Sequence, residues 1–319
     1  MTEPNDAQER IIEGTEGVYC VDAGPGTGKT FAATRRYATI VDQPGVEPDD
    51  VLLVTFTRNA ATEMKERVVE RSAYGLQALR DAPIGTFHSL CHDILLEHGF
   101  AAPRLLGIDD GITSATRLLE DELLEEQRFR EFIDGFSDDH PEHADVFRVV
   151  SDPTELLGLI NQLAAKGVFP TAEGWYRNGE RHLDGDFEAF RAWFEEANQP
   201  RNDGRKQSEL RSALTGYGKD KCYRAAAPRR VEVRGDGTKA VPSAVAERAF
   251  AEDREALKAF VHDVYHGYLA FALSRNYLNF GFLQGLAYVL LCEHDRLREQ
   301  LAFDYVMVDE FQDTSEIQF

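Results

Sequence analysis

One glycine-rich segment near the N-terminus has residue types and spacing that suit phosphate groups. Glycines let consecutive backbone N–H groups converge on phosphate oxygens, and a helix that follows adds the positive end of its dipole. Lys29 would reach the β- and γ-phosphates, and the Thr30 hydroxyl would coordinate Mg²⁺. An apolar run precedes the segment and a helical pattern follows it, so it predicts a site for ATP with Mg²⁺. The segment consists of Ala23, Gly24, Pro25, Gly26, Thr27, Gly28, Lys29 and Thr30.

Two carboxylates follow the last apolar run of the chain. Asp309 and Glu310 come directly after residues 303–308, where the end of a strand can face a phosphate-binding loop. Asp309 would hold Mg²⁺, and Glu310 would orient and deprotonate the attacking water. An Asp-Glu pair after a strand is common by itself. Together with the glycine-rich segment it predicts an ATPase-type site.

Apolar runs alternate with helical periodicity over the first hundred residues. Strands that alternate with helices form a parallel sheet covered on both faces, so the pattern predicts an α/β fold of the P-loop NTPase class. We expect Asn59 to cap the second of the helices. The expected strands are 18–21, 51–56, 84–87 and 303–308, and the expected helices are 29–41, 59–79 and 89–97.

The middle of the chain follows a different pattern. It predicts mostly helices with acidic faces, for example at 118–124, and helical periodicity returns over 245–298. Residues 201–240 are polar and poor in aliphatic side chains, which predicts a long loop. The expected domains are an α/β domain made of 1–104 and 282–319 and an inserted, mostly helical subdomain at 105–281.

The net charge of −21 argues against a polyanionic partner, but the charge is unevenly distributed. Residues 201–240 contain eleven basic and five acidic residues, a net of +6, which leaves −27 for the rest of the chain. Tyr217 and Tyr223 lie among these basic residues. A basic loop with aromatic residues could grip DNA phosphates, with Arg229 and Arg230 as candidates. The alternative is a solvated loop that pairs with the acidic helices beside it.

Composition places the chain among globular proteins, with 43% hydrophobic and 29% charged residues. No apolar run approaches the ~20 residues that span a bilayer, and the polar N-terminus resembles neither a signal nor a transit peptide. We therefore expect a cytoplasmic protein without a membrane partner. Acid excess with eight lysines against 27 arginines favours a halophilic source, with an ordinary acidic protein as the alternative.

The four cysteines lie far apart in the sequence, at Cys20, Cys91, Cys222 and Cys292. This excludes the usual zinc and redox spacings and gives no sign of a disulfide framework. We expect Cys20, in an apolar run, to be a small buried side chain.

Five segments together resemble superfamily 1 DNA helicases of the UvrD/Rep/PcrA group, and they occur in the order of that family. Gln8 closes a segment like the Q motif, and residues 23–30 match motif I. Residues 54–67 and 85–91 resemble motifs Ia and Ib, and 309–314 match motif II, where Phe-Gln-Asp-Thr follows Asp-Glu. The resemblance implies a RecA-like domain of an ATP-dependent helicase that moves 3′ to 5′ along single-stranded DNA in repair or recombination.

The resemblance also implies roles for individual residues. Gln8 would read the adenine edge, and Gln312 would sense the γ-phosphate and couple it to the DNA path. Phe56 would stack on a base, which is sequence-tolerant and suits a motor that passes any base. Strand alternation leaves the alternative that Phe56 is a core residue. The other predicted DNA contacts are Thr57, Arg58, Thr86 and His88.

His88 and His92 are four residues apart, the spacing of a metal-binding pair on a helix. No third ligand stands at a recognisable spacing, which favours a structural role for both.

Two features depart from the family pattern. Motif Ia has Thr57, Arg58 and Asn59 where many relatives have Thr-Asn-Lys, which affects the polar contacts expected there. The later motifs, which bring a second RecA-like domain with arginine fingers and an adenine-stacking aromatic residue, are not among these 319 residues. We therefore expect an N-terminal half that hydrolyses ATP weakly by itself, with junction and single-stranded DNA, ATP and the second domain as partners. The alternatives are part of a RecB/AddA-type helicase-nuclease and a truncated, non-catalytic ATP- or DNA-binding module.

Overall fold

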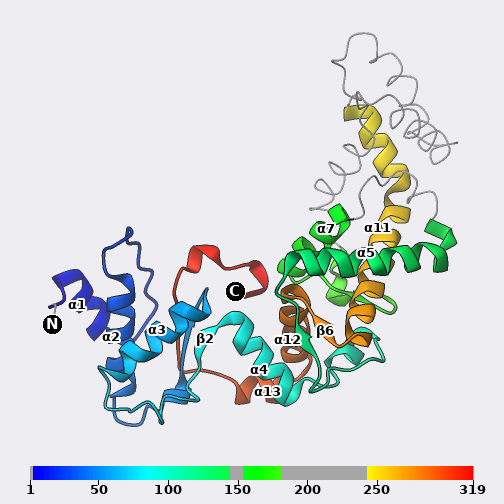
Figure 1. The fold of residues 1–319 in the computed structure, drawn as a ribbon. Coiled ribbons are helices and arrows are strands. Elements are labelled where there is room, and N and C mark those ends of the chain that lie inside the picture. Colours follow the sequence, from blue (N-terminus) through cyan, green and yellow to red (C-terminus); the bar gives the residue numbers. More distant parts are fainter. Residues whose placement is uncertain (1–2, 144–153, 181–242, 319) are drawn as a thin grey trace. The chain divides into compact units, whose positions relative to one another are not determined.

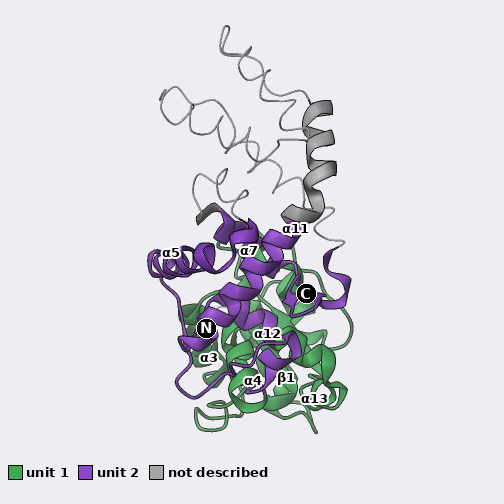
Figure 2. Cartoon of the chain, turned by 90° about the vertical axis from the view of Figure 1, so that its right-hand side faces the viewer, with its two compact units in different colours: residues 1–98, 287–319 green, residues 99–286 purple. Residues whose placement is uncertain are grey.

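A computed structural model describes residues 3–143, 154–180 and 243–318 of the chain (Figure 1). The chain divides into two compact units (Figure 2). Unit 1 contains residues 1–98 and 287–319, and unit 2 contains residues 99–286. The sequence prediction placed its domain boundaries at 104/105 and 281/282.

The sheet of unit 1 has three parallel strands among the described residues. They are β1 (Val51–Thr55), β2 (Ile84–Thr86) and β7 (Tyr305–Val308), in the order β2-β1-β7. Leu53 of β1 is in register with Ile84 on one side and Met307 on the other. The last strand of the chain therefore lies beside the first, and the parallel sheet confirms the predicted α/β class.

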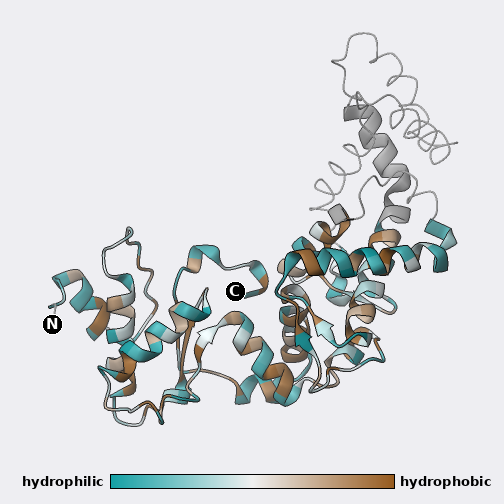
Figure 3. Cartoon of the chain, viewed as in Figure 1, coloured by the Kyte–Doolittle hydropathy of each residue, from teal (hydrophilic) through white to brown (hydrophobic). Residues whose placement is uncertain are grey.

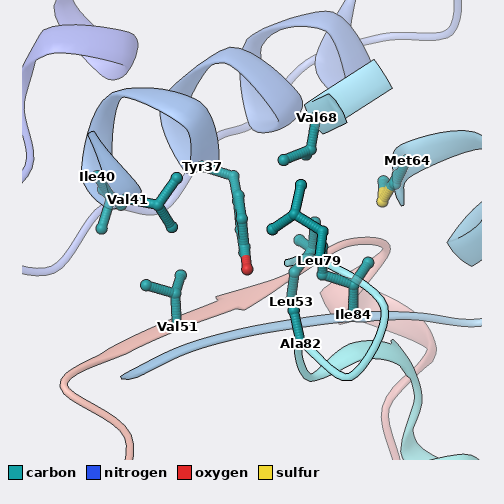
Figure 4. Packing of buried hydrophobic residues seen from close by; sticks show 10 residues of the cluster. All are labelled: Tyr37, Ile40, Val41, Val51, Leu53, Met64, Val68, Leu79, Ala82 and Ile84. Atoms are coloured by element: carbon teal, nitrogen blue, oxygen red, sulfur yellow. The ribbon is translucent and has the colours of Figure 1, made fainter. Parts of the chain in front are cut away.

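Helices α2 (Lys29–Val41) and α3 (Arg58–Val69) both pack against β1. The core between them and the sheet is apolar and almost fully buried, with Tyr37, Met64 and Val68 at 0% exposure. Figure 4 shows ten residues of this cluster. They are Tyr37, Ile40, Val41, Val51, Leu53, Met64, Val68, Leu79, Ala82 and Ile84. The remaining elements of unit 1 are α1 (Asp6–Glu13), η1 (Pro48–Asp50), α4 (Phe87–His98), α13 (Asp295–Gln300), η5 (Phe311–Asp313) and η6 (Glu316–Gln318).

The predicted strand at 18–21 is wrong, and so is the expected burial of Cys20. This segment has no strand pairing, Cys20 is exposed, and Val18 and Tyr19 are 103% and 47% exposed. Apolar residues form a strand only where a neighbouring strand accepts their backbone hydrogen bonds. Within the described part of the chain, β7 has β1 as its sheet partner and no strand on its other side.

The helix predicted at 59–79 begins earlier and ends earlier than expected. Thr57, not Asn59, is its N-cap, because the Thr57 hydroxyl accepts the Ala60 N–H at 3.1 Å. The helix ends at Val69. A turn follows, in which the Ser72 hydroxyl accepts the Tyr74 N–H and donates to the Tyr74 carbonyl, both at 3.3 Å. Leu79 still reaches the core at 0% exposure, but through irregular chain rather than helix.

Unit 2 is mostly helical. Its main helices are α5 (Glu122–Asp139), α7 (Thr154–Ala165), α11 (Ser243–Ser274) and α12 (Phe280–Glu293), which continues into unit 1. On α5 the buried residues Phe129, Phe132, Ile133 and Phe136 recur at helical spacing, and hydrophilic and hydrophobic bands alternate along the helix (Figure 3). The short elements are η2 (Ala102–Leu106), β3 (Arg117–Leu118), η3 (Pro141–His143), β4 (Pro170–Thr171), β5 (Gly174–Trp175), η4 (Tyr176–Asn178) and β6 (Tyr277–Leu278).

The prediction of helix over 118–124 is wrong for its first half. Arg117 and Leu118 form β3, which pairs in parallel with Tyr277 and Leu278 of β6. The Asp121 carboxylate then caps α5 by accepting the Leu123 and Leu124 N–H groups at 2.9 and 3.1 Å. An aspartate at this position favours helix initiation, so the helix starts only after it.

A histidine–aspartate network ties α11 to neighbouring segments of unit 2. Asp263 lies between two imidazoles, with its carboxylate oxygens 2.8 Å from His143 Nε2 and 2.8 Å from His262 Nδ1. His262 Nε2 lies 2.9 Å from the carbonyl oxygens of Thr171 and Gly174. Both nitrogens of His262 thus face acceptors, and the whole network forms only when both are protonated. Burial acts to raise the pKa of Asp263, but the hydrogen bonds from His262 and His143 outweigh it and hold that pKa below its ordinary value.

Asp263→Asn should destabilise unit 2 by about 1–2 kcal/mol at neutral pH, a figure discounted for the partial exposure of the carboxylate. Because the folded-state pKa of Asp263 is lowered, its stabilisation is present above the unfolded pKa of about 3.9 and is lost as pH falls through the folded value. Urea unfolding from pH 7 to pH 3 measures the free energy of unfolding of the wild type and of the variant. The difference between these two free energies should shrink as pH falls. A difference that does not depend on pH would contradict the role given to the charge of Asp263. Asp295→Asn, at an exposed ion pair with Arg298, is the control.

Candidate nucleotide-binding site

The glycine-rich segment forms a tight loop at the N-terminus of α2. Gly26 and Gly28 have φ angles of +75° and +88°, which side-chain-bearing residues rarely adopt. The Thr27 hydroxyl donates to the Gly24 carbonyl at 2.7 Å, which closes the loop on itself. Gly28 is the N-cap residue of α2, so Lys29 and the following residue open the helix. The loop thus presents the helix N-terminus and the lysine together, as a phosphate site needs.

Helix α1 is attached to this loop by Gln8. Its amide nitrogen donates to the Thr27 carbonyl at 2.9 Å, and its amide oxygen accepts the Asn5 N–H at 3.0 Å. Asn5 in return caps α1 by accepting the Gln8 N–H at 2.9 Å. The side chain predicted to read adenine therefore lies against the phosphate-binding loop, and the adenine contact stays a prediction.

Arg36 was missed by the sequence reasoning, although it holds the same region together. It is 9% exposed, its guanidinium donates to the Ile11 and Gly14 carbonyls at the end of α1, and it lies 4.5 Å from the centre of the Tyr19 ring. Burial acts to lower the pKa of Arg36, while Tyr19 acts to raise it. No sequence signal distinguishes Arg36 from its neighbour Arg35, because the contacts come from a segment far away in the chain.

The backbone after β7 places Asp309 at the end of the sheet. Its N–H donates to the Val54 carbonyl of β1 at 2.8 Å, which continues the strand pairing by one residue. Burial and the neighbouring Glu310 raise the pKa of the Asp309 carboxyl, while Lys29 and a hydrogen bond from the Thr55 side chain oppose the rise. The carboxyl group is thus partly withdrawn from water, with the Lys29 ammonium nearby.

Glu310 turns the chain away from the sheet. Its φ and ψ of +56° and +47° are left-handed, an unusual conformation for a residue with a side chain. The turn brings Gln312 back, and its amide nitrogen donates to Glu310 Oε2 at 2.6 Å. Lys29 Nζ lies 3.7 Å from Glu310 Oε1. The hydrogen bond from Gln312, then the charge of Lys29, lower the pKa of Glu310 and keep it ionised.

The residues of motif Ia that are predicted to contact DNA come directly after β1 and lie at the surface. Phe56 is 47% exposed, which excludes the core alternative, and Thr57 and Arg58 are also exposed. His88 is partly exposed on α4.

Thr86, by contrast, is buried at 6% exposure. Its hydroxyl accepts the Ser89 N–H at 3.1 Å, and its own N–H donates to the Ser89 hydroxyl at 2.8 Å, so Thr86 holds the start of α4. The DNA contact predicted for its side chain stays a prediction.

Arg229, Arg230 and the basic segment 201–240 lie outside the described residues, so their contact with DNA stays a prediction. Within the part of the chain that the structure describes, no group of three or more His, Cys, Asp or Glu side chains could hold a metal ion. Burial raises the pKa of the Cys91 thiol to about 12, which disfavours the reactive thiolate form. No described helix is long and apolar enough to cross a membrane.

A phosphate-binding loop that opens a helix, with an acidic pair at the end of a parallel strand facing its lysine, defines a P-loop nucleotide-binding protein. Comparison with known families narrows this class. The model of the UvrD/REP helicase N-terminal domain matches residues 4–319, so the chain belongs to that family and is a UvrD-like DNA helicase domain.

Individual relatives are similar over shorter stretches. The "Probable DNA helicase II homolog" of Mycoplasma pneumoniae is 35% identical over 136 residues, which cover 42% of this chain and 18% of the relative. The ATP-dependent DNA helicase PcrA of Staphylococcus aureus is 44% identical over 91 residues, or 28% of this chain and 12% of the relative. The ATP-dependent DNA helicase SRS2 of Saccharomyces cerevisiae is 40% identical over 89 residues, or 28% and 8%. The chain thus matches less than a fifth of the length of each of these proteins.

Proposed function

We propose that this protein hydrolyses ATP and couples hydrolysis to 3′ to 5′ movement along single-stranded DNA, in DNA repair or recombination. The observation that carries the proposal is the convergence of Lys29 from the loop with Glu310 and Gln312 from the far end of the chain. The family match supports the DNA-directed part of the proposal. The chain would be the N-terminal half of the motor, and a second RecA-like domain would complete the site.

The side chains at this site suit Mg²⁺ and triphosphate. The Thr30 hydroxyl and the Asp309 carboxylate are hard oxygen ligands, which Mg²⁺ prefers when phosphates supply further oxygens. Bound Mg²⁺ would neutralise charge on the phosphates. Lys29 would bind the β- and γ-phosphates, and Glu310, held ionised by Gln312, would accept a proton from the attacking water.

The exposed turn after β1 supports contact with DNA. Phe56 offers an aromatic face on which any base can stack, and Arg58 beside it can reach a backbone phosphate. We propose that single-stranded DNA passes over this turn and past His88. Arg229 and Arg230 are proposed as further phosphate contacts on the inserted subdomain, and high ionic strength would weaken such contacts in a halophilic cell.

Glu310→Gln should leave ATP binding within about twofold of wild type and abolish the weak hydrolysis expected of this chain, because the amide cannot accept the proton. Nucleotide binding and phosphate release are measured separately, with single-stranded DNA present. Glu63→Gln, which changes an exposed glutamate of α3 paired with Arg67, is the matched control and should hydrolyse normally. Undiminished hydrolysis by the Glu310 variant would show that another residue is the base.

A further inference from the structure

Helix α1 is held in unit 1 largely by polar bonds. Of its eight residues, all of which the structure describes, none is buried, and Ile11 and Ile12 are half-buried. A helix of this length does not persist by itself in water, so its position depends on contacts with the rest of the unit. One polar contact lies near each end of the helix, at Gln8 and at the carbonyls of its last turn.

Near the start of α1, Gln8 fits closely against the phosphate-binding loop. Its amide nitrogen donates to the Thr27 carbonyl at 2.9 Å and lies over Gly28, where an added Cβ atom would come within 2.8 Å of it. The Asn5 N–H donates to the amide oxygen at 3.0 Å, so the Gln8 side chain is fixed from both sides. Gly26 and Gly28 flank Thr27, and glycine adopts many backbone conformations with similar ease. The bond from Gln8 therefore restrains a loop that its own residues leave free to move.

At the other end of α1, Arg36 of α2 fixes the last turn. Its guanidinium donates to the carbonyls of Ile11 and Gly14. The last carbonyls of a helix have no partner within it, and a guanidinium supplies several donors in a rigid geometry. The Tyr19 ring covers the guanidinium at 4.5 Å, and an added Cβ atom at Gly14 would lie 2.5 Å from the Tyr19 hydroxyl oxygen. Arg36 is thus enclosed at 9% exposure, and the end of α1 is held in one place.

We infer that Arg36 is a positioning residue for the phosphate-binding loop: it fixes α1, and α1 in turn presents Gln8 to Thr27. The inference rests on the proposed function, because it takes residues 23–30 as the site of the triphosphate. Arg36 acts through α1, since its bonds go to the end of that helix and Gln8 makes the bond to the loop. Because that bond goes to the loop backbone, the effect falls on the phosphate groups of the ligand rather than on its base.

A double-mutant cycle tests this coupling between two side chains on different helices. Arg36→Met keeps much of the side-chain stem but loses the guanidinium donors, and it is combined with Gln8→Ala. Titration calorimetry with Mg²⁺ measures the affinity of each protein for ATP and for inorganic triphosphate. Each single variant should bind both ligands roughly 5-fold more weakly, as expected for the loss of one restraining hydrogen bond. The double variant should bind them no more weakly than Arg36→Met does.

Arg67→Met is the matched control, because it changes an arginine of α3 in the same unit whose guanidinium pairs with Glu63. It should bind both ligands as the wild type does. Thermal unfolding identifies any loss of fold, and Arg36→Lys, which keeps the charge and fewer donors, replaces Arg36→Met in the cycle if that variant does not fold.

Three results would overturn the inference while the proposed function stands. They are losses that multiply in the double variant, weaker binding of ATP with unchanged binding of triphosphate, and wild-type affinities in Gln8→Ala. If the wild type itself binds neither ATP nor triphosphate, the proposed function is wrong and the inference falls with it.

Discussion

Lys29→Ala should lower the affinity for Mg-ATP by at least about 100-fold while leaving the fold intact. Lys29 supplies the positive side chain at the loop, and it faces Glu310 at 3.7 Å with Asp309 close by. Without the ammonium, Mg²⁺ alone would offset the negative charge of the phosphates and of the two carboxylates. Charge-assisted hydrogen bonds to phosphate are among the strongest that a side chain makes, and about 2.7 kcal/mol corresponds to a hundredfold change in affinity.

Titration calorimetry with ATP and Mg²⁺ measures this loss directly. Lys65→Ala is the control, because Lys65 lies on α3 of the same unit and its ammonium bonds the Arg80 carbonyl rather than the loop. It should bind ATP as the wild type does. ATP affinity preserved in the Lys29 variant, with unchanged thermal unfolding, would show that residues 23–30 are not the phosphate site.

Asn279→Ala should destabilise unit 2 by about 2–3 kcal/mol, because buried hydrogen-bonding groups lose their partner. The Asn279 side chain is the N-cap of α12, since its oxygen accepts the buried Phe282 N–H at 2.7 Å. Its nitrogen donates to Glu125 Oε1 of α5 at 2.6 Å and to Asn161 Oδ1 of α7 at 3.1 Å. One side chain at 2% exposure thus connects three helices, and its loss leaves the half-buried carboxyl group of Glu125 and the buried Phe282 N–H without this partner.

Two graded variants separate this network from a general packing defect. Asn161→Ala leaves the Asn279 cap of α12 and its bond to Glu125 in place, and should cost about 1 kcal/mol. Burial raises the pKa of Glu125 against the opposing bonds from Asn279 and Asn161, so its charged form is disfavoured. Glu125→Gln should therefore change the free energy of unfolding by less than about 1 kcal/mol at neutral pH. Urea unfolding measures the free energy of unfolding of all three variants. Equal destabilisation by Asn279→Ala and Asn161→Ala would contradict the network.

Some of the fold was predictable because its signals are local. The helix at 29–41 has the predicted bounds, and the strands at 51–56, 84–87 and 303–308 are present with ends moved by one or two residues. Apolar periodicity and the chemistry of caps act between residues close in sequence, so the sequence carries them. The errors arose where two local signals compete, as between Thr57 and Asn59 for the cap of α3.

The segment at 18–21 failed for a different reason. Its composition is that of a buried strand, but strand formation requires hydrogen-bond partners on another segment. The described sheet gives it none, so Val18 and Tyr19 are exposed. A local pattern specifies a preference, and only the presence of a neighbour turns that preference into a strand.

For the candidate site, too, the sequence determined one part and the tertiary structure another. The residue types at 23–30 and at 309–310 by themselves specify phosphate and cation chemistry, because glycine conformation, a lysine and carboxylates carry it wherever the fold places them. Which side chains meet was decided by the tertiary structure. The parallel pairing of β7 with β1 brings Glu310 to Lys29 and Asp309 to Thr55, and the core packing of α2 seats Arg36 on the end of α1. These contacts join segments far apart in the chain, and no local rule contains them, since they depend on how the sheet and its helices close on one core.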